Sequence, residues 1–84
     1  MANKVPEDEM DKYGLTVRQR QYLRLVACNL SDLEIAERLG VSRQTVKNTM
    51  TRVKELIGIN GRVGCAMWYA AHYGIPPEYR WRDL

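Results

Sequence analysis

The stretch LGVSRQTVKN, residues 39–48, places a helix stop, a helix start and a polar run close together. Gly40 is typical of a helix end, because glycine adopts the left-handed conformation there without a Cβ clash. Ser42 is typical of a helix start, where its hydroxyl can accept a hydrogen bond from a free backbone N–H group. Only Gly40 and Val41 lie between these two signals, so the two helices must turn sharply. The pattern predicts a helix-turn-helix.

Similar signals mark the rest of the chain. Thr16 with Gln19 and Ser31 with Glu34 are capping boxes, each of which starts a helix. Together with the glycines, they predict helices over about 17–29, 32–39, 43–57 and 61–73. Alternation of period two is absent from the sequence, so the predicted fold class is all-α with four helices.

The ends of the chain differ from its middle. Residues 1–14 are polar and lack periodicity, which predicts a flexible arm. A helical domain is expected over 15–74, followed by a tail at 75–84 that Pro76 and Pro77 keep from continuing the helix.

Residues 15–62 hold nine Arg or Lys against four Asp or Glu, within a chain of net charge +3. On charge alone, a solvated basic face and a nucleic-acid-binding face explain this excess equally well.

Several function classes find no support in the sequence. No apolar run approaches the ~20 residues of a membrane span, and no signal peptide begins the chain. Cys28 and Cys65 lack metal-type or redox-type spacing and lie in apolar helical patterns, which predicts core positions. With a single His, no Gly-rich phosphate loop and no catalytic set, neither an enzyme nor a metal or cofactor is expected. A cytoplasmic setting fits best.

The third predicted helix has two distinct faces. Val46, Met50, Val53 and Ile57 recur at helical spacing and form its inner face. The opposite face carries amide, ammonium, hydroxyl and guanidinium groups and no acid before its last turn. Its members are Gln44, Lys47, Asn48, Thr51, Arg52 and Glu55. Such groups can bind base edges and phosphates in a major groove that is wide enough for a helix, which predicts DNA recognition.

Residues 15–66 resemble the LuxR/GerE/NarL-type four-helix DNA-binding domain. The landmarks are Leu15-Thr16, Arg18, Ile35-Ala36, Leu39, Ser42, Thr45-Val46-Lys47, Gly58 and Arg62. Asn29 departs from the Gly that is usual there, a mild change because Asn also adopts left-handed geometry. The resemblance implies a transcription regulator whose third helix enters the major groove, with Lys47, Asn48 and Thr51 nearest the bases. Gln44 is a further base-reading candidate, and the expected backbone contacts are Arg43, Thr45, Arg52 and Arg62.

The fourth predicted helix is apolar almost all round, so it should be covered on both sides. One face holds Val63, Ala66, Met67, Ala70 and Tyr73, and the other holds Cys65, Trp68, Tyr69 and His72. Most relatives carry a further domain that controls dimerisation, for which this chain has no room. Either the protein acts alone, like the GerE subgroup, or the chain is an excised domain, and Met1 with its distinctive arm favours the first. A protein that acts alone needs a dimer surface, which we expect at Cys65, Trp68, Tyr69 and His72. In the alternative, the tail with Tyr79 and Trp81 folds back over that second face.

Two other readings stay open at the level of sequence. A sigma-factor region-four-like module also uses a helix-turn-helix, although the helix after GINGR, residues 58–62, favours the LuxR type. A protein-binding adaptor is the second alternative, and RNA polymerase is a further candidate partner. An acidic side chain in place of Lys47 would favour the adaptor, whereas position 47 holds a basic residue.

Overall fold

The computed structural model describes residues 9–79, which form four α-helices around one core. The helices are α1 (Val17–Ala27), α2 (Asp32–Leu39), α3 (Arg43–Ile57) and α4 (Arg62–Tyr73). An isolated bridge between Met10 and Thr16 is the strand-like pairing found among these residues. The predicted all-α, four-helix fold is confirmed.

The helix starts follow from local hydrogen bonds that the sequence predicts. Thr16 and Ser31 accept from the N–H groups of Gln19 and Glu34, whose side chains accept from the two cap N–H groups in return. Ser42 caps α3 by accepting from the N–H of Thr45 at 3.0 Å. Each bond satisfies an N–H group that has no partner within its helix.

Helix α1 ends two residues before the predicted limit near Asn29. Its last helical residue is Ala27, and Cys28 is the C-cap. Asn29 has φ +70°, in the left-handed region, and its N–H donates to the carbonyl of Val26 at 3.0 Å. The chain therefore reverses at Asn29, as a C-terminal glycine would make it do.

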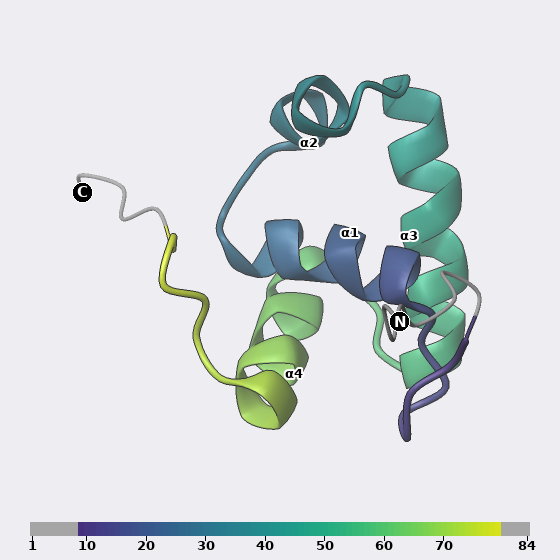
Figure 1. Ribbon diagram of the computed structural model, residues 1–84, viewed down its shortest axis with the longest axis vertical. Helices are drawn as coiled ribbons and strands as arrows, with labels where there is room; N and C mark the ends of the chain where they lie inside the picture. The colour runs from purple at the N-terminus through teal and green to yellow at the C-terminus, as the bar shows by residue number, and fades with distance from the viewer. Residues whose placement is uncertain (1–8, 80–84) are drawn as a thin grey trace, which may run out of the picture.

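Helix α1 lies at the centre of the fold and packs against each of the other three helices (Figure 1). Both cysteines are fully buried, as predicted. The core combines residues of all four helices and of the segments before α1 and α2. Its largest fully buried side chains are Tyr22, Leu15, Leu23, Ile35, Val46, Val53, Cys28 and Cys65.

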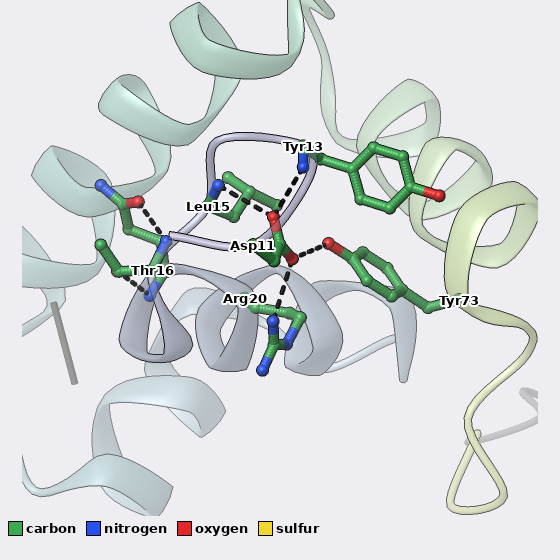
Figure 2. A network of polar contacts seen from close by, with 7 residues as sticks. Asp11, Tyr13, Leu15, Thr16, Arg20 and Tyr73 are labelled. Atoms are coloured by element: carbon green, nitrogen blue, oxygen red, sulfur yellow. Dashed lines mark hydrogen bonds and ion pairs between the residues drawn. The ribbon is translucent and has the colours of Figure 1, made fainter. Parts of the chain in front are cut away.

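The segment before α1 is fastened to the domain through Asp11 (Figure 2). Its carboxylate accepts from the N–H groups of Tyr13 and Leu15 at 2.9 and 3.1 Å, from Arg20 at 2.9 Å and from the Tyr73 hydroxyl. Desolvation raises the pKa of Asp11, but the bonds from Tyr73, the two N–H groups and Arg20 outweigh it and hold the pKa at about 2. Asp11 thus joins the start of the domain to the last residue of α4.

These contacts bear on the predicted arm, residues 1–14. Its first eight residues lie outside the described part of the chain, as do residues 80–84 of the predicted tail. From Asp11 onward the arm is bonded to α1 and α4. The domain boundaries at 14 and 74 stay predictions.

Replacing Asp11 by Ala should lower the free energy of unfolding at pH 7 by about 1–3 kcal/mol, because its partly buried partners lose their acceptor. The folded-state pKa lies below the ordinary 3.8. The stabilisation is therefore present above about pH 4 and is lost as the pH falls towards 2. Urea unfolding at pH 7 and at about pH 2.5 measures both effects, with Glu9→Ala removing an exposed carboxylate as the control. A difference that stays constant between the two pH values would contradict this account.

Candidate nucleic-acid interface

The turn between α2 and α3 sets the direction of the third helix. Gly40 ends α2 with φ +69° and ψ 35°, and the N–H of Val41 donates to the carbonyl of Ala36 at 3.0 Å. Ser42 has an extended backbone and is the N-cap of α3, which begins at the next residue, Arg43. Helices α2 and α3 pack directly against each other (Figure 1). Together they form the predicted helix-turn-helix.

Helix α3 buries one side and exposes the other, as its periodicity predicts. Val46, Met50 and Val53 are buried, and Ile57 is half-buried against the core. The predicted interface residues of α3 are all exposed: Arg43, Gln44, Thr45, Lys47, Asn48, Thr51 and Arg52. These seven residues, together with the exposed Glu55, are called the outer row of α3 below. The outer row is the side of α3 that a large partner can contact.

Local bonds orient several members of this row. The amide nitrogen of Gln44 donates to the side-chain oxygen of Asn48 at 2.9 Å. The hydroxyl of Thr51 donates to the carbonyl of Lys47 at 2.9 Å, and the hydroxyls of Thr45 and Ser42 are 3.0 Å apart. The Gln44–Asn48 bond does not use the side-chain N–H groups of Asn48 or the side-chain carbonyl of Gln44, and both residues are exposed. These are the donors and acceptors that an adenine edge requires.

Arg62 lies on α4, beside the start of α2. Its guanidinium forms an ion pair with Asp32 at 2.8 Å and donates to the carbonyl of Leu30. The sequence offered no signal for this pairing, because Asp32 and Arg62 are thirty residues apart. Arg62 as a DNA-backbone contact stays a prediction, since its cation already has partners within the chain.

Two hollows flank α3, and Asp32 lines both. One, of about 350 Å³, is also lined by Lys47, Thr51, Lys54 and Arg62 among others. The second, of about 420 Å³, lies between Asp32 and the start of α3, where Arg43, Gln44 and Lys47 line it. Four cationic residues of α3 and α4 therefore line the hollows beside Asp32: Arg43, Lys47, Lys54 and Arg62.

The predicted dimer residues lie mostly inside the chain. Cys65 and Tyr69 are core residues, 0% and 7% exposed. Trp68 is half-buried and meets Tyr13 edge to face at 5.4 Å, while the exposed His72 stacks on Trp68 at 4.1 Å. The core that α1 shares thus covers Cys65 and Tyr69 on this face of α4, and Tyr13 of the segment before α1 packs on Trp68, where the sequence had offered a partner or the tail. A contact between copies stays a prediction, but burial leaves Cys65 and Tyr69 unable to make it.

The exposed apolar side chains of α4 lie on its other face. Val63 is 73% exposed and Met67 67%, and Ile75, just after the helix, is 70% exposed. All three line an open hollow of about 380 Å³ between the end of α1, α4 and the segment after it. Val63, Met67 and Ile75 thus form an exposed apolar patch on α4 and the segment after it.

Within residues 9–79, no group of three or more His, Cys, Asp or Glu side chains could hold a metal ion. None of the helices in that range is both long and apolar enough to cross a membrane.

Comparison with known proteins fits this geometry. A sequence model of the family described as "Bacterial regulatory proteins, luxR family" matches residues 13–69. The chain belongs to the luxR family. This luxR-family chain is also 38% identical over 62 residues to the "Probable transcriptional regulatory protein SgaR" of Hyphomicrobium methylovorum. The match covers 74% of this chain and 28% of that protein, so the chain spans less than a third of the relative's length. No solved structure gave a significant match.

Family membership decides two of the questions that the sequence raised. The domain is of the luxR type rather than the sigma-factor type, since the matched region runs from residue 13 through the turn and into α4. The family consists of regulatory proteins, so the chain is a regulatory protein and not an enzyme.

Replacing Gly40 by Ala should destabilise the luxR-family domain by about 1–2 kcal/mol, the strain of a left-handed Ala. A Cβ at this position would meet no atom within 4 Å, so no steric clash adds to the backbone strain. Gly40→Asn should be milder because Asn tolerates this conformation. Chemical denaturation of the two variants measures the difference, and Gly58→Ala, also at φ +70° with no atom within 4 Å of the added Cβ, serves as a comparison that should lose a similar amount. Equal losses for Ala and Asn would refute the argument.

Proposed function

We propose that this protein is a transcription regulator that binds double-stranded DNA by inserting α3 into the major groove. The outer row of α3 carries the proposal. It presents donors and cations over the first three turns of the helix, and its acid, Glu55, lies near the end and 3.6 Å from Arg52. A row of this composition matches the donor and acceptor pattern of base edges and the charge of the phosphates.

The roles within the row follow from chemistry and position. Lys47 can donate to guanine, Asn48 and Gln44 can pair with adenine, and Thr51 can contact either base type. Arg43 and Thr45 lie in the first turn of α3, and Arg52 lies beyond the base-reading residues. We assign these three to the DNA backbone, where contacts fix the register of the protein without reading sequence.

The name of the relative, a probable transcriptional regulatory protein, supports the same function for this chain. Because the match covers 28% of that protein, the support concerns the shared domain. A cytoplasmic location, where bacterial DNA is accessible, and contact with RNA polymerase belong to the same proposal.

We propose further that two copies associate through the apolar patch of α4. One recognition helix contacts only a few base pairs, and two-fold dimers gain specificity by binding two half-sites. Val63 and Met67 lie exposed on α4, and Ile75 extends the patch beyond the helix. Exposed apolar side chains gathered in this way mark interaction surfaces. The patch therefore replaces the predicted face of Cys65, Trp68, Tyr69 and His72 in this proposal.

A protein-binding adaptor is the competing function. A gel shift on random-sequence duplex DNA at several salt concentrations separates the two. A DNA-binding protein should bind with an affinity that falls steeply as salt rises, because cations on the protein displace counterions from the phosphates. No binding at low salt would refute the proposed function and favour the adaptor.

Lys47→Ala should weaken binding to the preferred site, selected from a random DNA library, by about 1–3 kcal/mol. Its effect on random DNA should be smaller, because Lys47 is assigned to a base. Arg43→Ala is the matched comparison: it should weaken binding to all sequences alike and lower the slope of log affinity against log salt by about one. Fluorescence anisotropy on both duplexes measures these effects. An unchanged affinity in Lys47→Ala would remove α3 as the reading helix.

Met67→Glu should raise the dissociation constant of the dimer at least about tenfold, since a charge in an apolar contact costs about 1.4 kcal/mol or more. Trp68→Ala should instead lower thermal stability, because Trp68 packs on Tyr13 within the chain. Sedimentation and thermal unfolding of both variants distinguish the two faces of α4. A folded monomer for Trp68→Ala with an intact dimer for Met67→Glu would return the contact to the sequence-predicted face.

A further inference from the structure

Asp32 is an acid in cationic surroundings. It is the first residue of α2, and its side chain is 32% exposed. The other charged residues that line its two hollows are Arg43, Lys47, Lys54 and Arg62, all of them cationic. Among the described residues around these hollows, Asp32 is the one carboxylate. It therefore lies on the side of the molecule where phosphates would approach.

The ion pair with Asp32 determines what Arg62 can bind. One guanidinium nitrogen lies 2.8 Å from the carboxylate and the other donates to the carbonyl of Leu30. The Arg62 side chain is nevertheless 44% exposed, so a phosphate can reach it. Because a phosphate and a carboxylate bind the same kind of arginine N–H group, a phosphate that reaches the N–H facing Asp32 competes with that carboxylate for Arg62.

We propose that Asp32 competes with DNA phosphates for Arg62 and thereby limits the part of DNA affinity that does not depend on sequence. The carboxylate occupies Arg62 when DNA is absent. The base-reading residues of α3 are left to supply a larger share of the total affinity.

The inference rests on the proposed function, because it assumes that α3 faces DNA. It goes beyond that function by assigning a role to a residue of α2, outside the outer row of α3. The inference also gives Arg62 a role that does not require a permanent contact with a DNA phosphate.

Asp32→Asn tests the inference. Asn removes the charge but keeps an oxygen that can accept from Arg62, so the fold should be retained. If Arg62 then gains one phosphate contact, the slope of log affinity against log salt should steepen by about 0.9 on random-sequence duplex DNA. At 0.1 M salt this corresponds to a roughly five- to tenfold gain in affinity. Glu37→Gln is the matched control, because it removes one negative charge from an exposed position on the same helix.

Arg62→Ala supplies the second half of the test. When Asp32→Asn is made in the Arg62→Ala background, the gain in affinity and slope should disappear, since the cation that was released is gone. Circular dichroism establishes that each variant is folded. A gain that persists without Arg62 would overturn competition for Arg62 as the mechanism.

The remaining outcomes separate this inference from the proposed function. Absence of salt-dependent binding by the unmodified protein would refute the proposed function. Binding by the unmodified protein with equal slopes for Asp32→Asn and Glu37→Gln would overturn the role of Asp32 alone. Weaker binding by a folded Asp32→Asn would also overturn it, because the ion pair would then support DNA binding rather than oppose it.

Discussion

The burial of α1 against α2, α3 and α4 is the constraint on which the other features depend. Leu23 and Val26 of α1 belong to the same core as Val46 and Val53 of α3, so α3 can rotate about its axis only by exposing apolar side chains. Exposing each such side chain to water would cost about 1.5–3 kcal/mol. The outer row of α3 therefore faces outward because the opposite side of the helix is packed in the core. Hydrogen bonds within the row are not needed to set the side on which it lies.

The sequence could predict those features that depend on neighbours within one helical turn. Thr16, Ser31 and Ser42 act within three residues, and Gly40 acts through its own backbone. The outer row of α3 was predictable for a related reason. The helical periodicity of apolar positions identifies the buried side of a helix, whichever element packs against it. The end of α1 was placed too late because Asn29 can continue a helix or leave it, and only the chain beyond it decides which.

Contacts between distant residues could not be predicted in this way. Helix α4 is apolar on two faces, and its periodicity does not say which face is covered. Cys65 and Tyr69 of one face enter the core, and Trp68 of the same face packs on Tyr13, which lies ahead of the first helix and looked like part of a polar arm. The pairing of Asp32 with Arg62 was hidden for the same reason. Charge and spacing identify each residue as polar, but the fold alone brings the two together.

Polar ties at both ends give α4 a fixed direction. Arg62, its first residue, is bonded to Asp32 and Leu30, and Tyr73, its last, is bonded to Asp11. Between them, Cys65 and Tyr69 pack into the core. A domain of this size buries a limited apolar surface, so directional bonds matter more to the orientation of a terminal helix than in a larger protein. The apolar patch of Val63 and Met67 is consequently held at a set angle to α3. Any partner that binds this patch is thereby positioned relative to the outer row of α3.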